Sequence, residues 1–251
     1  MIYEIKNTHN IQDFFMNNTE TMITSCLQGV MGHIYGDDPI YPKSIVAIIG
    51  DLVFLAGIPH QELLLFALQK NFMIFVPIEK KWNVLIESTF PHFCKRMRYA
   101  TKKDNTFSTH HLEKMISQLP SSYSLYAIDQ QLFDYCQNHQ WCHDVVSQFD
   151  CYEDYERMGI GYMILKNNQP VCGASSYTCY LQGIEIQIDT HADYQQRGLA
   201  SVCAAKLILE CLKKGKYPSW DAQNVISLHL AEKLGYIFDY EYEVYEITKE
   251  I

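Results

Sequence analysis

The stretch that most constrains this chain is Gly183–Ala205, where a strand pattern changes into a helix pattern across a short polar turn. Isoleucines and polar residues alternate from residue 184 to residue 189, which is the period of a strand buried on one face. From Gly198 onward the apolar residues recur at helical spacing. A strand that enters a helix through a glycine turn leaves backbone N–H groups pointing out of the helix start, where the helix dipole also attracts negative charge. The sequence therefore predicts an anion site at this turn.

Composition narrows the class of protein. The 251 residues are 48% hydrophobic and 20% charged, which is enough to bury a substantial core. The net charge of −9 argues against a broad nucleic-acid surface, because phosphate binding over a wide area needs clustered lysine and arginine. The acidic balance also favours a cationic partner such as an amine. No apolar run reaches about 18 residues, so we expect no membrane span, and the N-terminal stretch lacks the basic and apolar regions of a secretory signal.

The cysteines favour a reducing compartment. Nine of them are scattered along the chain without a CxxC pair. Free buried thiols in a cytoplasmic protein are the natural interpretation. Cys136, His139, Cys142 and His143 lie close enough in sequence for a zinc site, but their spacing matches no zinc pattern. Ordinary surface and core residues on two helical turns explain them better, and we expect no metal.

The predicted elements divide the chain in two. Pro120 and the two serines after it are typical of a domain boundary. This boundary separates a smaller N-terminal α/β domain, residues 1–120, from a second domain, residues 121–251. In the first domain the patterns predict a β-hairpin at 44–56, a helix at 60–70 and a strand at 72–77. Direct comparison of the sequence with itself shows no internal repeat.

The second domain has the clearer pattern of predicted strands and helices. From residue 121 the patterns predict the order β, α, α, β, β, β, α, β, α, β. That order indicates an α/β fold of the mixed α+β kind, with a mostly antiparallel sheet flanked by helices. One βαβ crossover is expected, from a strand at 184–190 through a helix at 198–214 to a strand at 217–222.

Three features of the second domain resemble the Gcn5-related N-acetyltransferase (GNAT) superfamily. The motif Q-x-x-G-x-A, from Gln195 to Ala200, matches that superfamily's acetyl-CoA motif at a strand-to-helix turn. The motif N-x-x-S, from Asn224 to Ser227, with the run Leu230–Tyr236 after it, is similar to the superfamily's asparagine-containing helix that ends in Leu-Gly-Phe/Tyr. Both lie on either side of a short strand, as in the superfamily. The whole chain also looks like a bacterial subgroup with an extra N-terminal domain, which includes zwittermicin-resistance-type acetyltransferases.

The resemblance implies acetyl-CoA as cosubstrate, with its pyrophosphate at the turn and its pantetheine arm along the preceding strand. Gly198 permits close approach of the phosphates. Asn224 is explained as well by a helix N-cap role, and Ser227 by that of a small surface residue on a helix. The implied cofactor contacts are Ile188 and Thr190 through backbone atoms, then Gln195, Gln196, Arg197, Gly198, Leu199, Ala200, Ser201, Asn224 and Ser227.

The superfamily's reaction is direct attack of an amine on the thioester, which needs a base, an oxyanion donor and often an acid. Glu185 lies about where some members carry a glutamate base, and it shares a strand face with Gln187 and Asp189. A merely solvated face explains Glu185 about equally well, and explains Asp189 better. The Ile188 N–H would be the oxyanion donor if the strand carries a bulge. Ala231 stands where many members carry a tyrosine acid, so the acid is unassigned.

We therefore expect a cytoplasmic N-acetyltransferase that acts on a primary amine of a small molecule and has no nucleic-acid or membrane partner. The N-terminal domain would form an acceptor wall or a dimer surface, so a homodimer stays open. A non-catalytic acyl-CoA-binding or regulatory module is the alternative, because the missing tyrosine could signal lost chemistry. The chain has neither GxGxxG nor GK[S/T], which makes a dinucleotide or nucleoside triphosphate enzyme a distant third.

Overall fold

A computed structural model of the chain describes residues 1–16 and 18–249. The chain folds into two compact units. Unit 1 comprises Met1–Arg98 and Glu241–Ile251, and unit 2 comprises Tyr99–Tyr240. The chain thus passes between the units after residues 98 and 240, whereas the sequence places a boundary at residue 120. The difference arises because residues 99 and 100 already pair with a strand of unit 2.

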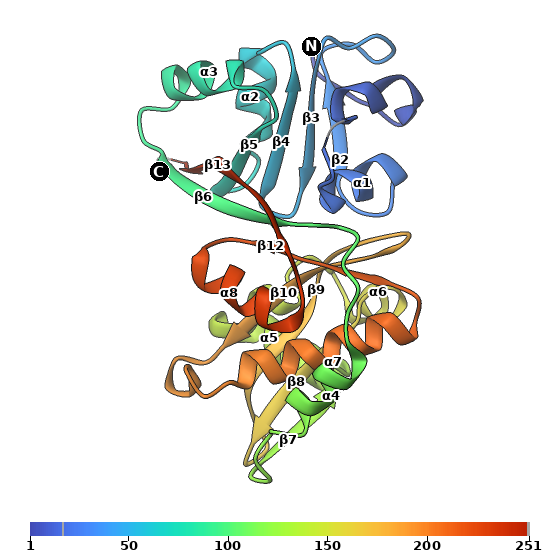
Figure 1. Ribbon diagram of the computed structural model, residues 1–251. Coiled ribbons are helices and arrows are strands. Elements are labelled where there is room, and N and C mark those ends of the chain that lie inside the picture. The colour runs from blue at the N-terminus through green and yellow to red at the C-terminus, as the bar shows by residue number, and fades with distance from the viewer. Residues whose placement is uncertain (17, 250–251) are drawn as a thin grey trace. The chain divides into compact units, whose positions relative to one another are not determined.

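Unit 1 is built on a sheet whose strands lie in the order β1-β2-β3-β4-β5-β13 (Figure 1). Its neighbouring strands are antiparallel, except that β4 and β5 run parallel. Two strands, β6 and β13, run from one unit into the other. The elements are β1 (Tyr3–Glu4), η1 (Thr8–Phe15), α1 (Thr21–Gln28), β2 (His33–Gly36), β3 (Ser44–Ile49), β4 (Leu52–Gly57), α2 (Gln61–Ala67), β5 (Phe72–Pro77), α3 (Lys81–Thr89), β6 (Cys94–Thr101) and β13 (Phe238–Thr248).

The predicted hairpin of unit 1 is confirmed. β3 and β4 pair along their whole length, from Ser44 opposite Gly57 to Ile49 opposite Leu52. Gly50 begins the tight connection with a φ of 60°, a left-handed value that glycine adopts without strain. Both strands are buried at almost every position, as their continuous apolar runs indicate.

Trp82 is the largest fully buried side chain of unit 1, and it gives a test of how this core is held. Its indole packs in a cluster with Leu55, Phe75 and Tyr245, and its Nε1 donates a hydrogen bond of 3.1 Å to the Gly57 carbonyl. We expect Trp82→Ala to lower the free energy of unfolding by about 3–5 kcal/mol, because it leaves a cavity and an unpaired carbonyl. Trp82→Phe keeps most of the apolar volume and should cost less. Urea unfolding followed by circular dichroism measures both, and equal stability of Trp82→Ala and wild type would contradict the expectation.

Unit 2 is built on a sheet with the order β11-β10-β9-β8-β7. Its neighbouring strands are antiparallel, except that β10 and β11 run parallel. This confirms a mixed, mostly antiparallel sheet with one crossover. The elements are α4 (Thr109–Ile116), β7 (Tyr123–Ala127), α5 (Gln130–Asn138), η2 (Gln140–Val145), α6 (Tyr152–Met158), β8 (Gly161–Lys166), β9 (Gln169–Tyr180), β10 (Gly183–Thr190), η3 (Ala192–Tyr194), α7 (Leu199–Lys213), β11 (Tyr217–Ser219), β12 (Asp221–Ala222) and α8 (Val225–Leu234).

Helices cover both faces of the sheet in unit 2. On one face the Lys206 ammonium of α7 lies over the Tyr162 ring, 4.7 Å from its centroid. On the other, the Cys136 thiol of α5 contacts the Met163 sulfur at 3.4 Å. Consecutive residues of a strand point to opposite faces, so α7 and α5 lie on opposite sides of the sheet.

Two predicted elements of unit 2 are wrong in extent. The strand expected at 217–222 is split at Trp220 into β11, which pairs with β10, and β12, which pairs with β6. Trp220 is buried, and its Nε1 donates to the Ser227 Oγ at 3.1 Å, so the chain bends to place the indole. The second helix in the predicted order of this domain is likewise two segments, η2 and α6.

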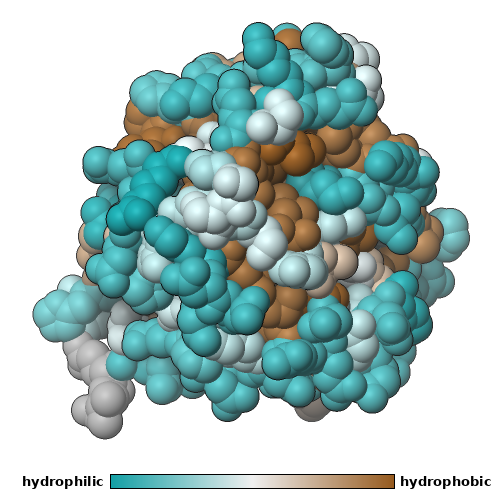
Figure 2. All heavy atoms as spheres, turned by 90° about the horizontal axis from the view of Figure 1, so that it is seen from below, coloured by the Kyte–Doolittle hydropathy of each residue, from teal (hydrophilic) through white to brown (hydrophobic). Residues whose placement is uncertain are grey.

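The surface is polar with apolar islands. Figure 2 shows one face on which hydrophobic residues gather in the middle of a hydrophilic surround. The large hydrophobic side chains of unit 2 that are more than half exposed are Tyr126, Leu181, Ile226 and Ile237. In the part of the chain that the structure describes, no helix has the length and apolar character needed to cross a membrane.

Candidate functional site

The strand β10 has an open edge. β11 pairs with its first three residues, from Gly183 opposite Tyr217 to Glu185 opposite Ser219. β10 then continues to Thr190, with β9 as its partner on the other side. Within the described residues no strand pairs with β10 on the β11 side beyond Glu185. The two parallel strands therefore part and leave a wedge along the second half of β10.

The backbone groups that face this wedge can be assigned from the register. The His191 N–H donates to the Val171 carbonyl at 3.0 Å, so the odd-numbered residues of β10 bond to β9 at this end. The even-numbered residues Ile186, Ile188 and Thr190 consequently direct their N–H and C=O groups toward the open edge. An extended chain lying in the wedge would find the hydrogen bonds of an added strand there.

The sequence makes Ile188 the oxyanion donor on condition that the strand carries a bulge, and the structure has a bulge between β9 and β10. The register between β9 and β10 shifts between Glu185 and Ile186, where β9 contains one extra residue, Tyr177. The bulge thus coincides with the point at which β11 departs. The Ile188 N–H faces the wedge through the ordinary alternation of the strand and needs no bulge to do so.

The turn after β10 prepares the start of α7. Gln196 and Gly198 both have left-handed backbone conformations, with φ of 58° and 76°. Gly198 is the N-cap of α7, which has no side-chain cap. The first bond within the helix is from the Val202 N–H to the Gly198 carbonyl, at 3.3 Å. The N–H groups of residues 199–201 therefore point out of the helix, and no atom lies within 4 Å of the position that a Cβ on Gly198 would take.

Two polar side chains hold this turn in place. The Gln195 Nε2 donates to the Thr190 carbonyl at 3.4 Å. The Arg197 guanidinium donates to the Asp193 carbonyl at 2.7 Å and lies over the Tyr194 ring, 5.0 Å from its centroid. Both contacts leave the backbone donors at the helix start uncovered, and Arg197 adds a positive charge beside them.

Asn224 and Ser227 have structural roles at the start of α8. The Asn224 Oδ1 accepts from the Ser227 N–H at 2.9 Å, which confirms the N-cap interpretation. The Ser227 Oγ accepts from the indole of Trp220. Their contact with a cofactor stays a prediction, which these bonds neither require nor prevent.

The polar face of β10 carries two carboxylates in different surroundings. Glu185 is 3% exposed, and its Oε1 accepts from the Asp221 N–H at 2.6 Å. It thereby fastens β10 to the bend between β11 and β12. Asp189 is half-buried beside the wedge, and its Oδ2 accepts from the Gln187 Nε2 at 3.0 Å. The sequence favours Glu185 as the base, but in the structure Asp189 is the more accessible carboxylate.

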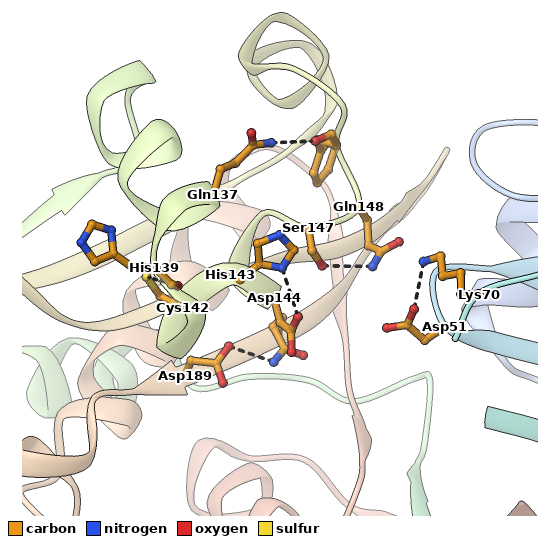
Figure 3. Close-up of polar contacts among 12 residues, drawn as sticks. Asp51, Lys70, Gln137, His139, Cys142, His143, Asp144, Ser147, Gln148 and Asp189 are labelled. Atoms are coloured by element: carbon orange, nitrogen blue, oxygen red, sulfur yellow. Dashed lines mark hydrogen bonds and ion pairs between the residues drawn. The ribbon is translucent and has the colours of Figure 1, made fainter. Parts of the chain in front are cut away.

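The surroundings of Asp189 alter its acidity. Burial raises the pKa of its carboxyl to about 6, the Gln187 bond opposes this rise, and the nearby Asp144 carboxylate adds to it. Figure 3 shows Asp189 on its strand, close to the η2 segment that carries His143 and Asp144. The His143 Nδ1 lies 3.6 Å from the Asp144 Oδ1. A carboxylate with such a pKa is half-charged near pH 6 and can accept a proton at neutral pH.

Other candidate groups have structural surroundings. Ala231 is fully buried, and Tyr236 is buried with its hydroxyl donating to the Pro218 carbonyl at 2.5 Å, as expected of a packed residue. Among the described residues no cluster of three or more metal-ligating side chains occurs. In the cysteine–histidine cluster considered for zinc, His139 stacks on Tyr135 with ring centroids 3.7 Å apart. The sequence missed the bond between Glu185 and Asp221, because nothing in the local pattern shows that Asp221 lies beside β10.

Comparison with known proteins decides the family. The family model described as GNAT acetyltransferase matches residues 12–245. The chain belongs to the GNAT acetyltransferase family. The predicted resemblance to this superfamily is thereby confirmed, whereas the zwittermicin-resistance-type subgroup stays a prediction.

Individual relatives of this GNAT protein agree in fold and length. A crystal structure of a GCN5-related N-acetyltransferase-like protein from Streptococcus suis 89/1591 is 44% identical, with a TM-score of 0.93 over 96% of this chain and 98% of that one. The protein of Bacillus subtilis (strain 168) named Uncharacterized N-acetyltransferase YdfB is 27% identical over 90% of this chain and 89% of its own. A tandem GNAT protein from the clavulanic acid biosynthesis pathway shares the fold alone, at 7% identity and a TM-score of 0.51 over 99% of this chain and 98% of that one.

Proposed function

We propose that this GNAT protein transfers an acetyl group from acetyl-CoA to a primary amine of a small molecule. One observation carries the proposal: the open edge of β10 leads through a single turn, residues 191–198, into the uncapped start of α7. An edge of strand donors and acceptors followed by a cluster of free N–H groups suits a ligand with an extended amide arm and a pyrophosphate. Coenzyme A has this shape and chemistry.

The residues present fit acetyl-CoA. Ile188 and Thr190 face the wedge with their backbone groups and would bond the amides of the pantetheine arm. Residues 199–201 would donate their N–H groups to the pyrophosphate, and Gly198 leaves open space in front of them. When bound, acetyl-CoA supplies an activated thioester carbonyl.

The chain's own part in the reaction is to hold the acceptor amine and take its proton. The carboxylates of Glu185 and Asp189 share the face of β10 beside the wedge. Glu185 is the base that the resemblance implies, but the Asp221 N–H already occupies one of its oxygens. Asp189 has the more open position and the raised pKa that suits a base at neutral pH. We therefore propose Asp189 as the proton acceptor. For the thiolate of coenzyme A we propose water as the proton donor, since Ala231 supplies none.

Two further observations support a cellular compartment and a class of acceptor. All nine cysteines are free thiols, which supports the cytoplasm as the compartment. The net charge of −9 and the carboxylates beside the wedge support a cationic amine as the acceptor. A homodimer remains a proposal that the acidic, partly apolar surface allows.

An acetyl-CoA consumption screen tests the proposed function. Wild-type protein is incubated with acetyl-CoA and one amine at a time, drawn from polyamines, aminoglycosides, amino-acid amides and peptides, and thiol release is followed. We expect release above the no-amine rate with at least one class of amine. Tight acetyl-CoA binding without release for any amine would instead support the non-catalytic acyl-CoA-binding module.

A further inference from the structure

The two units repeat one order of elements. In unit 1 a strand, β1, is followed by η1 and α1, then by β2, β3, β4, α2, β5, α3 and β6. In unit 2 a strand, β7, is followed by α5, η2 and α6, then by β8, β9, β10, α7, β11 with β12, α8 and β13. The connecting helix α4 stands outside the repeat. Each unit thus follows the same path of a strand, a helical segment, three strands, and then helix, strand, helix, strand.

The sheets repeat as well. The order β1-β2-β3-β4-β5 corresponds to β7-β8-β9-β10-β11, and in each the last pair is the parallel one. The final strands also correspond, because each pairs with a strand from the other half of the chain. β13 pairs with β5 through Tyr245–Thr248, and β6 pairs with β12 through Tyr99 and Ala100. Direct comparison of the sequence shows no such repeat, since topology persists where residue identity does not.

The units differ where β10 opens into a wedge. The corresponding strand of unit 1, β4, pairs with β5 from Leu52 opposite Ile74 to Leu55 opposite Pro77. The Ile78 N–H then bonds to the Leu55 carbonyl at 2.9 Å. β4 thus extends two residues beyond its last partner in β5, whereas β10 continues five residues beyond its last partner in β11.

Both backbone groups of Gly57, the last residue of β4, are already hydrogen-bonded to side chains. The Gly57 N–H donates to the Glu79 Oε1 at 3.2 Å, and the Gly57 carbonyl accepts from the Trp82 indole at 3.1 Å. The groups that would bond an added strand are thus already bonded within unit 1. A Cβ on Gly57 would clash with the Lys43 carbonyl oxygen, so the backbone is also enclosed on the side of β3.

The turn after β4 also lacks the donors of its counterpart. Pro59 has no N–H, and the side chain of His60 caps the Leu63 N–H at 3.3 Å. The helix that follows, α2, has 7 residues, against 15 in α7. One N–H group at the start of α2 is therefore already occupied, and the shorter helix has the smaller dipole.

We propose that unit 1 is a second copy of the acetyltransferase topology whose acyl-CoA wedge is closed by Glu79 and Trp82, so that the chain binds one coenzyme A, in unit 2. This inference rests on the proposed function, since it takes the wedge of β10 as the working site. Unit 1 retains the strand pairing of this topology although its wedge is closed.

Isothermal titration of the full chain with coenzyme A tests the proposal. We expect one site per chain in wild type and no measurable binding in Gly198→Trp, which blocks unit 2 alone. Two sites in wild type would overturn the closed wedge while leaving the proposed function standing. One site of unchanged affinity in Gly198→Trp would overturn the pyrophosphate site at residues 199–201, on which the proposal rests. No binding by wild type would overturn the proposed function, and the single site with it.

Amide hydrogen exchange locates the bound ligand independently of any variant. With coenzyme A added to wild type, we expect slower exchange in peptides that cover residues 186–190 and 199–201, and unchanged exchange in peptides that cover residues 55–60. Slower exchange in the peptides that cover residues 55–60 would overturn the proposal. The measurement separates the two wedges even if Gly198→Trp should fold poorly.

Discussion

Asp189→Asn should lower turnover by about 10²- to 10⁴-fold, the range that removal of a general base typically costs. Asparagine keeps the size and an acceptor for the Gln187 amide but cannot take the proton of an attacking amine. The affinity for acetyl-CoA, measured by titration, should stay within a few-fold of wild type, because the proposed contacts of β10 with the cofactor are made by its backbone. Steady-state kinetics with the best amine from the screen measures the loss.

The pH dependence of kcat/KM tests Asp189 as the base more specifically than the loss of turnover does. A base works in its deprotonated form, and burial raises the pKa of Asp189 to about 6. The value of kcat/KM in wild type should therefore fall as the pH drops through about 6, and this fall should vanish in Asp189→Asn. The titratable groups near Asp189 are Asp144, which raises its pKa, and His143, whose Nδ1 contacts the Asp144 carboxylate. Cys136 of α5 lies on the same side of the sheet.

Asp189→Asn should lower turnover but raise the stability of the folded protein. Since the folded-state pKa of Asp189 lies above its ordinary value, the folded protein favours the protonated acid, and ionisation at neutral pH weakens the fold. Asp189→Asn should therefore raise the free energy of unfolding at pH 7 by on the order of 1–3 kcal/mol. The gain should shrink as the pH falls from about 6 to about 4, where both folded and unfolded Asp189 become protonated.

Glu185→Gln is the matched control. Glutamine keeps an oxygen that can accept from the Asp221 N–H, so the bend after β11 is preserved. We expect a smaller loss of turnover than in Asp189→Asn, with the fall near pH 6 retained. The reverse ranking, in which Glu185→Gln loses turnover and Asp189→Asn does not, would return the role of base to Glu185.

Gly198→Trp should weaken binding of acetyl-CoA at least 100-fold, on the order of 3 kcal/mol in binding free energy. An indole there would fill the open space in front of the start of α7 and cover the N–H groups of residues 199–201. The left-handed φ of 76° adds strain of about 1–2 kcal/mol for any side chain, which affects folding as well. Titration calorimetry of the variant measures the affinity.

Gly215→Trp separates the effect of backbone strain on stability from the effect of the indole on affinity. Gly215 follows the other end of α7, has a φ of 66°, and likewise has no atom within 4 Å of the position of an added Cβ. The two substitutions thus impose a similar backbone strain on the same helix, but Gly215 is far from the free N–H groups. We expect Gly215→Trp to lose stability without losing affinity. Unchanged affinity in Gly198→Trp would remove the pyrophosphate from this turn.

Local patterns predicted the elements that hold the site. The alternation of residues 184–189 and the helical spacing after Gly198 correspond to β10 and α7, and the chain enters α8 at Asn224 as expected of an N-cap. The hairpin of β8 and β9 turns at Asn167 and Asn168, which both have positive φ, as the Asn-Asn dipeptide suggests. These features depend on residues close together in the sequence, so their signals are local.

The features of the site that could not be predicted from the sequence depend on pairing between distant segments. The bond from Asp221 to Glu185 and the half-burial of Asp189 depend on segments that meet only in the folded chain. The same holds for the split of β11 and β12, because β12 takes its partner, β6, from more than 100 residues earlier. No periodicity within β12 could reveal that partner, and the boundary expected at residue 120 therefore lies beyond the strand where unit 2 begins.

The exchange of final strands has a consequence for how the chain is made. The edge of β5 is completed by Tyr245–Thr248, and Tyr245 fills the core of unit 1 beside Trp82. A ribosome that adds about 5–20 residues per second takes on the order of ten seconds to reach this strand after it has finished β6. Throughout that interval β5 presents an unpaired edge, the kind of surface that invites aggregation. Unit 1 is thus translated first but completed last.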